Sequence, residues 1–305
     1  MKTLIRRVFL FGIVLLLVFS TIDWIYSRFA MQSNYYPIES WYDMMHERID
    51  ADVVVMGNSR AWVHVSPVIL DSILKVDTYN LGMDGSPINR QVHKYNIYRN
   101  QNKAPRLIIQ TIDCFTFEYS ERSIPIIEQF FPFFWKSSIR KEFFRDEPFS
   151  FAEKYMPMLR YQGYGFWLFK SSPRRLVKGY EGQDRSWDGS IFNTVESLSF
   201  RRNATALKVL DTYLSKVKSE GINVVFVYTP FYIGATAKMT NLDEMYATYQ
   251  EVADKYDIPV LDYTYMDICY DTTYFYNAMH LNKSGAEIFS DSLANDIKRL
   301  GILDN

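Results

Sequence analysis

Residues 52–62 read DVVVMGNSRAW, and this stretch decides the fold. The four apolar residues 53–56 are too few for a helix and rich in β-branched side chains, which is typical of a strand buried on both faces of a parallel sheet. Gly57 permits a sharp turn, and Ser59 follows just beyond the carboxyl end of the strand. Ligands bind at that edge of open α/β sheets, so Ser59 is a candidate nucleophile. The alternative is that Ser59 caps the next helix.

The rest of the chain alternates strands with helices, which predicts an α/β protein with a parallel sheet. Further strands are expected at residues 78–81, 107–112, 223–228 and 258–261. Helices are expected at residues 66–74, 88–100, 201–219, 242–255 and 282–300. The pattern favours a three-layer α/β/α sandwich around a central five-stranded parallel sheet.

The second candidate for chemistry lies far downstream, in the stretch NAMHLNKSGAEIF at residues 277–289. His280 is one of four histidines and is expected in a loop just before the last helix. A loop histidine can turn toward a serine at the sheet edge. Ser59 and His280 therefore form a candidate pair of nucleophile and general base.

Three short blocks occur in the order found in a known family. They are Gly57-Asn58-Ser59, the run YNLGMDGSPI at residues 79–88, and His280-Leu281-Asn282 followed by Gly285-Ala286. Over residues 52–300, with a large insertion, the chain resembles the SGNH (GDSL-like) hydrolases and acyltransferases. It looks closest to membrane-anchored members of bacterial envelopes, including those that move acyl groups on polysaccharides.

The resemblance implies the flavodoxin-like sheet of the SGNH type and assigns roles to individual residues. Ser59 would be the nucleophile and His280 the base. The backbone N–H groups of Ser59 and Gly85 would bind the oxyanion, with Gly82 as the alternative to Gly85.

Two positions depart from the family pattern. Asn277 stands where the family has an aspartate, and Ile112 stands where it has an oxyanion-binding asparagine. The amide oxygen of Asn277 can accept the imidazole N–H, although it stabilises imidazolium less than a carboxylate does. Asp271 or Asp267, in the same expected loop, is the alternative acid, unless both are ordinary solvated loop residues.

Arg60 and Asn89 flank the expected site and are candidates for substrate binding. The competing interpretation is that they have surface or helix-capping roles. His64 and His93 fall in helical or turn segments and are expected to be structural.

The N-terminus carries Lys2, Arg6 and Arg7 before an apolar run at residues 8–22. We expect residues 1–30 to be an uncleaved membrane anchor with a cytoplasmic tip, and the remainder to be exported to the periplasm or cell exterior. A cleaved signal peptide is the alternative, although the sequence SRFA at 27–30 lacks a small-x-small cleavage site. Both interpretations export the body of the protein.

Residues 31–305 are expected to form one SGNH-like domain with an aromatic-rich insertion at about residues 118–200. The insertion contains FFPFFW at 130–135 and YQGYGFWLF at 161–169, where regular alternation fails. We expect it to fold over the site from the carboxyl edge of the third strand. Its aromatic side chains could stack on sugars or line an acyl pocket, or they could form a small core of their own.

Composition excludes several classes of function. The net charge is −1, so no basic field indicates nucleic acid. The sequence has no Cys/His ligand cluster, so it does not indicate a structural metal, and no cofactor is expected. Cys114 and Cys269 are the only cysteines, and they form either one disulfide bridge or two buried free thiols.

The resemblance and the expected export together imply a serine-dependent esterase or acyltransferase acting on an O-linked acyl group, with acetyl expected, of an envelope carbohydrate. The expected partners are the acylated carbohydrate and the membrane. The alternative is a catalytically silent SGNH-like module that binds glycan or a partner protein, which Asn277 and Ile112 favour. A nucleotide-binding function is disfavoured because no phosphate-cradling glycine loop follows the first strand.

Overall fold

The computed structural model describes residues 1–32, 36–46, 48–117, 127–143, 150–162, 176–189 and 197–304. The chain divides into two compact units. The N-terminal unit comprises Met1–Tyr42 and Glu121–Arg175, and the sheet unit comprises Asp43–Ser120 and Leu176–Asn305.

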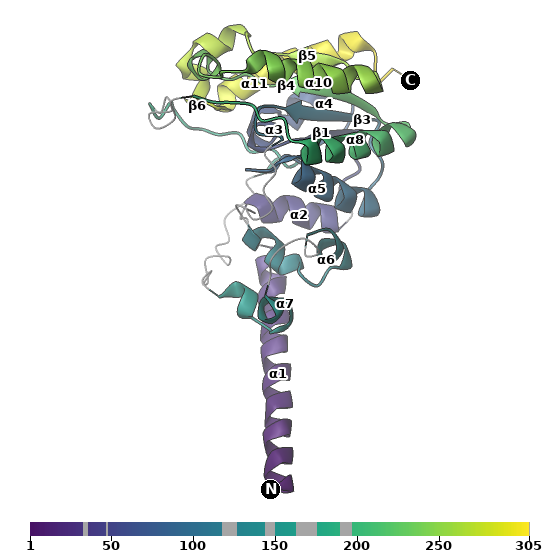
Figure 1. The fold of residues 1–305 in the computed structure, drawn as a ribbon, viewed down its shortest axis with the longest axis vertical. Helices are drawn as coiled ribbons and strands as arrows, with labels where there is room; N and C mark the ends of the chain where they lie inside the picture. The colour runs from purple at the N-terminus through teal and green to yellow at the C-terminus, as the bar shows by residue number, and fades with distance from the viewer. Residues whose placement is uncertain are drawn as a thin grey trace. The chain divides into compact units, whose positions relative to one another are not determined.

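The sheet unit is built on five parallel strands in the order β2-β1-β3-β4-β5 (Figure 1). The strands are β1 (Val53–Met56), β2 (Thr78–Asn80), β3 (Leu107–Ile112), β4 (Asn223–Tyr228) and β5 (Val260–Asp262). Val53 of β1 pairs with Thr78 on one side and with Leu107 on the other. The predicted five-stranded parallel sheet is confirmed, and the strand predictions at 53–56, 107–112 and 223–228 match to the residue.

Helices cover both faces of this sheet. α3 (Ser59–His64), α4 (Pro67–Leu74) and α11 (Lys283–Leu300) pack together on one face. α5 (Ile88–Gln101), α8 (Ala204–Ser219) and α10 (Leu242–Tyr256) pack together on the other. Phe289 of α11 belongs to the same core cluster as Val53 and Val55, whereas Tyr249 of α10 lies against Phe226, with ring centroids 6.2 Å apart.

The strand order places the candidate site. β1 has β2 on one side and β3 on the other, so the winding of the sheet reverses there. Ligands bind at the carboxyl ends of the strands at such a switch point. Residues that directly follow β1 and β3 are therefore the ones best placed to meet a substrate.

Short elements complete the carboxyl edge of the sheet. α9 (Ile233–Thr236) follows β4, and η4 (Asp267–Tyr270) and η5 (Thr272–Tyr274) follow β5. They lead into an antiparallel ribbon of β6 (Phe275–Asn277) and β7 (His280–Leu281), which directly precedes α11. His280 therefore lies in a short strand rather than in the predicted loop.

The N-terminal unit begins with α1 (Lys2–Ala30), which is long and apolar enough to cross a membrane. By length and composition alone, this helix fits either an anchor or a signal sequence. α2 (Tyr36–Met45) follows it. Later in the chain, the unit contains η1 (Ile127–Phe133), α6 (Ser137–Phe143), α7 (Phe151–Tyr155) and η2 (Leu159–Tyr161).

The aromatic run at residues 130–135 is mostly core. Phe130, Phe131, Phe133 and Phe134 are all buried, so they are core residues, but the core is shared with α2, because the ring of Trp41 lies 5.0 Å from that of Phe130. The ring of Phe131 lies 5.7 Å from that of Tyr161. The second aromatic run lies outside the described residues after position 162.

The division at residue 30 and an insertion folded over the site stay predictions. The structure groups residues 121–175 with the helix α1, and it assigns residues 176–200 to the sheet unit.

Cys114 and Cys269 are both buried free thiols, so the structure contains no bridge between them. Burial raises the pKa of Cys269 to about 12. The Cys269 thiol is therefore not poised as a nucleophile at neutral pH.

Candidate active site

The turn between β1 and α3 requires glycine at position 57. Its φ is +152°, and a Cβ placed there would lie 1.9 Å from the side-chain oxygen Oγ1 of Thr111 and 2.7 Å from the Cβ of Ala61. A side chain would clash with the neighbouring strand β3 and with α3. Gly57 thus lets the chain pass from a central strand into a helix within two residues.

Asn58 caps this helix, and Ser59 is its first residue. The Oδ1 atom of Asn58 accepts a hydrogen bond from the backbone N–H of Arg60 at 3.0 Å. The alternative role of Ser59 as the helix cap is therefore wrong, because the preceding residue does that work. The Ser59 hydroxyl is left to make a contact outside the helix.

That contact is with His280, which is 221 positions away in the chain. Ser59 Oγ lies 2.8 Å from His280 Nε2, and His280 Nδ1 lies 3.0 Å from Oδ1 of Asn277. The same Asn277 oxygen accepts the backbone N–H of Met279 at 3.0 Å, which identifies it as the acceptor. Because Asn277 accepts, His280 carries its hydrogen on Nδ1, and Nε2 can accept the Ser59 proton.

Two contacts hold His280 in place, one on its ring and one on the backbone of the next residue. Tyr276 stacks on it with centroids 5.3 Å apart and planes at 5°. On the backbone side, the N–H of Leu281 donates to Nε2 of His64 at 3.0 Å. His64 is fully buried, and that burial lowers its pKa well below the usual range. A neutral His64 thus acts as a structural acceptor that holds β7 against α3.

The environment keeps His280 uncharged. Burial lowers its pKa to about 4, and the positive charges of Arg60 and Arg185 act in the same direction, while Asp113 opposes them. At neutral pH the imidazole is therefore unprotonated and able to accept a proton. A general base needs that protonation state.

The other flank of Ser59 is held by a buried ion pair. Arg60 and Asp113 approach to 2.8 Å, and their side chains are 3% and 2% exposed. The Asp113 carboxylate also accepts from the Nδ2 of Asn58. Burial raises the pKa of Asp113, but the Arg60 charge and the hydrogen bonds from Asn58, Phe115 and Thr116 outweigh it and leave the pKa below its usual value.

The two residues that flank the serine in sequence are thus tied to one carboxylate. Asp113 directly follows β3, and Asn58 and Arg60 follow β1, so the contact joins the two strands at the switch point. The guanidinium of Arg60 also lies 3.9 Å from the centroid of the Phe231 ring. This arrangement fixes the backbone that carries Ser59.

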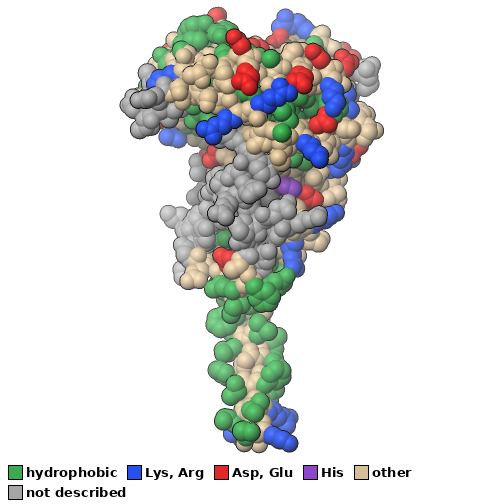
Figure 2. All heavy atoms as spheres, viewed as in Figure 1, with side chains coloured by type: hydrophobic (Ala, Val, Ile, Leu, Met, Phe, Trp, Pro, Cys, Tyr) green, Lys and Arg blue, Asp and Glu red, His purple; other side chains and the backbone are tan. Residues whose placement is uncertain are grey.

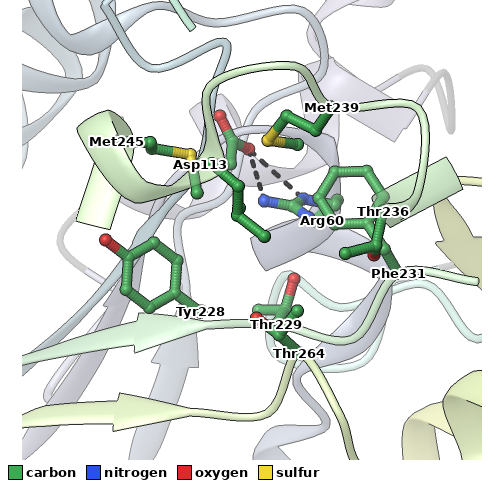
Figure 3. A pocket seen from close by; sticks show the side chains of 10 residues that line it. Arg60, Asp113, Tyr228, Thr229, Phe231, Thr236, Met239, Met245 and Thr264 are labelled. Carbon is green, nitrogen blue, oxygen red and sulfur yellow. Dashed lines mark hydrogen bonds and ion pairs between the residues drawn. The ribbon is translucent and has the colours of Figure 1, made fainter. Parts of the chain in front are cut away.

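A pocket opens beside this ion pair at the carboxyl edge of the sheet (Figure 3). Its volume is about 260 Å³, part of which is its open mouth. Four buried polar atoms in its lining have no hydrogen-bond partner within the described structure. They are Arg60 Nη1, Tyr228 Oη, Thr229 Oγ1 and Thr236 Oγ1. Such groups normally bind water or a polar ligand, and the enclosed space beside them has room for about one water molecule.

The structure distinguishes the two glycines that were considered as backbone N–H donors to the oxyanion. The N–H of Gly82 donates to Oδ1 of Asn80 at 2.8 Å, so its donor is already engaged. Gly85 is exposed, with a φ of +56°, and its role as an oxyanion donor stays a prediction. The Ile112 side chain is fully buried and supplies no donor.

The alternative acids do not reach the histidine. Asp267 and Asp271 are both exposed, and Asp271 instead accepts the backbone N–H of Thr273 at 2.9 Å, as the cap of η5. Asn277 alone among these three candidates contacts the His280 ring.

The two predicted substrate-binding residues differ in their surroundings. Arg60 is buried and paired with Asp113, so the surface and helix-capping roles considered for it are wrong. Asn89 lies in the first turn of α5 and is half-buried. Contact of either residue with a substrate stays a prediction.

Sequence reasoning gave no role to Asn58, Asp113 or Tyr276. Asn58 sits inside the serine block, and Asp113 follows the third strand just as Ser59 follows the first. That equivalence of position was the available signal, because carboxyl ends of adjacent parallel strands meet at one edge. Tyr276 had no comparable signal, since its stacking depends on the ribbon of β6 and β7.

Within the described ranges, no group of three or more His, Cys, Asp or Glu side chains is arranged to hold a metal ion.

Comparison with known proteins finds similarity of fold at low sequence identity. A psychrotrophic esterase EstA from Pseudoalteromonas sp. matches with a TM-score of 0.44 and 9% identity, over 83% of this chain and 98% of that chain. The acetyl xylan esterase AlAXEase matches with a TM-score of 0.42 and 10% identity, over 80% and 98%. A GDSL-like lipase from Bacteroides thetaiotaomicron matches with a TM-score of 0.40 and 10% identity, over 81% and 88%. No protein-family model and no curated protein sequence matches the chain.

Proposed function

We propose that the protein is a membrane-anchored serine esterase or acyltransferase that acts on an O-linked acyl group, with acetyl the expected group, of an envelope carbohydrate. The observation that carries the proposal is the 2.8 Å contact between Ser59 Oγ and His280 Nε2. The contact joins a residue after the first strand to one just before the last helix, and its tautomer leaves the base ready to accept a proton.

The chemistry follows from this contact. Ser59 Oγ attacks the ester carbonyl carbon while its proton passes to His280 Nε2, and the carbonyl oxygen becomes an oxyanion near the start of α3. Collapse of this intermediate breaks the ester bond, and the leaving hydroxyl takes the proton from Nε2. Water or a second sugar hydroxyl then attacks the acyl-serine, with His280 removing its proton; the bond between the acyl carbon and Ser59 Oγ breaks, and Oγ takes the proton back from Nε2. Water gives hydrolysis, and a sugar hydroxyl gives transfer.

The oxyanion would be stabilised by backbone donors. The N–H of Ser59 lies in the first turn of a helix, where backbone N–H groups have no partner inside the helix. Gly85 is the expected second donor, because the N–H of Gly82 is engaged by Asn80. A site that uses backbone donors does not need the side chain that Ile112 fails to supply.

The location follows from the N-terminus. Lys2, Arg6 and Arg7 precede the apolar part of α1, which favours a cytoplasmic N-terminus and an exported body. An exported esterase that remains at the membrane would meet carbohydrates of the cell envelope. The carbohydrate substrate rests on the family resemblance and on this location.

The test is covalent labelling of the purified full-length protein with an activated fluorophosphonate. We expect the wild type to be labelled and Ser59→Ala not to be labelled. Thr273→Ala is a matched control, since Thr273 is an exposed hydroxyl residue outside the site. Release of acetate from acetylated polysaccharide, with and without an added acceptor sugar, then separates hydrolysis from transfer. A folded wild type that neither labels nor deacylates any ester would contradict the proposal.

The second candidate is a catalytically silent module that binds glycan. Asn277 favours it, because an amide stabilises the imidazolium formed during catalysis less than a carboxylate does. Glycan binding that is measured in a folded protein with an unreactive Ser59 would support this candidate over the enzyme.

A further inference from the structure

The side chains of helix α1 change from exposed to partly buried at residue 23. All residues at positions 2–22 are exposed, and Asp23 is the first buried side chain of the helix. Positions 4–22 contain no charged residue other than Arg6 and Arg7, and these helical residues at about 1.5 Å each cover roughly 28 Å, which is close to the hydrocarbon thickness of a bilayer. Figure 2 shows hydrophobic side chains covering this part of α1. The end of the span therefore falls at position 22, eight residues before the helix ends.

The last two turns of α1 belong to the folded N-terminal unit. Asp23 is 2% exposed, forms an ion pair with Arg160, and accepts hydrogen bonds from the backbone N–H of Met158 at 2.8 Å and from Trp135 Nε1 at 3.2 Å. Ser27 Oγ and Tyr161 Oη lie 2.7 Å apart. These contacts hold the segments around residues 135 and 158–161 beside the end of the span.

Exposed aromatic side chains gather on this unit. Outside the span, the described part of the N-terminal unit has five: Trp24, Phe29, Trp135, Phe151 and Tyr155, each 50–77% exposed. The described part of the larger sheet unit has only Tyr265 and Tyr270. We call the five the aromatic collar. Exposed rings in such numbers mark a surface that contacts something apolar.

The collar lies at the level of the end of the span. Trp24 follows Asp23 in α1, and Trp135 donates to the Asp23 carboxylate. Phe151 and Tyr155 of α7 pair with ring centroids 4.7 Å apart. Figure 1 draws α7 beside α1, and the bond from Met158, three residues after α7, to Asp23 agrees with that placement. Trp and Tyr at this depth are typical of membrane interfaces.

Basic side chains accompany the collar. Arg28 lies 6.0 Å from the Trp24 ring, and Arg140 lies 5.6 Å from the Trp135 ring. Lys136 and Lys141 are exposed on the same segment as Trp135. Cations next to interfacial rings suit the phosphate groups of lipid headgroups.

We propose that the aromatic collar is a second membrane-contact surface, inserted among the lipid headgroups around the exit of α1. Its occupant is the lipid bilayer, because Trp24 directly follows the exposed apolar surface of α1, and Trp135 and the segment just after α7 are held beside Asp23 at the same point. The collar therefore fixes the depth of the N-terminal unit in the membrane, and it implies that α1 is retained, since its last turns are part of that unit. The proposal rests on α1 crossing the bilayer and is independent of the chemistry at Ser59.

The test uses the full-length protein in vesicles of phosphatidylcholine and phosphatidylglycerol that contain a lipid with a nitroxide near the headgroup. An environment-sensitive fluorophore is attached to Phe151→Cys and, separately, to Tyr155→Cys. Ile22→Cys reports the end of the span, and each labelled protein in vesicles without the nitroxide lipid gives the unquenched reference. The two native cysteines are buried, so the wild type gives the labelling background.

We expect the nitroxide to quench positions 151 and 155 as strongly as position 22, and several-fold relative to the same proteins in vesicles without nitroxide. Quenching at position 22 without quenching at 151 and 155 would overturn the proposal. A label at 151 that reports an apolar surrounding but is not quenched would also overturn it, in favour of a second protein surface on the collar. Loss of quenching at position 22 would remove its premise. Fluorophosphonate labelling of Ser59 in the same samples reports the proposed function separately.

Discussion

The two flanks of Ser59 are held by different chemistry. On one flank, His280 and Asn277 are half-buried and uncharged. His280 Nε2 contacts Ser59 Oγ at 2.8 Å, and Oδ1 of Asn277 contacts His280 Nδ1 at 3.0 Å. On the other flank, Arg60 and Asp113 are charged and almost completely buried. The buried carboxylate of this site therefore lies beside the backbone of the nucleophile and not behind the histidine.

This difference separates positioning from proton transfer. A buried ion pair is costly to break, so the Asp113 flank holds the serine-bearing turn in one geometry. The His280 flank carries no charge at neutral pH and can change protonation during a reaction. The comparison predicts that substitutions on the histidine flank change activity, and that substitutions on the carboxylate flank change stability first.

The largest expected effect is the loss of the base. His280→Ala should slow fluorophosphonate labelling of Ser59 by about 10³-fold or more, because no group remains to accept the serine proton. Labelling kinetics at pH 7 measure the loss. The melting temperature serves as the control for folding. An unchanged labelling rate would contradict the assignment of proton transfer to the histidine flank.

The carboxylate flank should respond in stability. Asp113→Asn leaves the Arg60 charge buried without its partner, which costs about 3–5 kcal/mol in the free energy of unfolding. Urea denaturation measures this cost. The matched control is Glu220→Gln, which breaks the partly exposed pair with Arg99 and should cost less than about 1 kcal/mol. Equal costs for the two variants would contradict a positioning role for Asp113.

The pH dependence of labelling reports the histidine flank directly. His280 has a pKa of about 4, so its neutral, base-competent form is present above that pH and is lost as the pH falls through 4. On the acid side, the labelling rate should therefore fall to half near pH 4, below the ordinary histidine pKa of about 6.5. We call this fall the acid limb. A limb near 6.5 would show that the ring is more solvated than its surroundings indicate. Asp113 raises the His280 pKa, so in a folded Asp113→Asn protein the limb should move still lower.

The smallest expected effect comes from restoring a carboxylate behind the histidine. Asn277→Asp would place a negative charge about 3 Å from Nδ1 of His280 and raise its pKa by about 1–3 units. The acid limb should move to higher pH, and labelling at pH 7 should rise by about threefold to tenfold as the imidazolium gains a partner. Asn277→Ala is the matched control, which should slow labelling. An acid limb that stays in place would mean that position 277 does not contact the working histidine.

Sequence patterns predicted the centre of the fold better than its edges. Runs such as 53–56 and 107–112 are apolar, β-branched and bounded by turns, so their limits could be read directly. For the edge strand β5 the sequence predicts residues 258–261, whereas the strand spans Val260–Asp262. It is only partly covered by neighbouring elements, so hydrophobicity marks its limits less sharply.

The candidate pair of Ser59 and His280 could be named from the sequence, but its support could not. The contacts of Asp113 with Asn58 and Arg60 depend on how two parallel strands end at the same edge. The strand conformation of His280 depends on the pairing of Asn277 with His280 in a two-strand ribbon, a contact too short to leave a hydrophobic period. The sequence also does not show which of Asn58 and Ser59 caps the helix, because asparagine and serine are both good caps.

For the membrane-anchored protein that we propose, the unbroken course of α1 has a consequence for the N-terminal unit. Because one helix runs from Lys2 to Ala30, and its last turns are locked by Asp23, any tilt of the span is passed to the N-terminal unit. A bilayer thinner than the span favours such tilting to relieve the hydrophobic mismatch. Membrane thickness would thereby set the orientation of this unit relative to the membrane plane. A flexible tether would not transmit the tilt in this way.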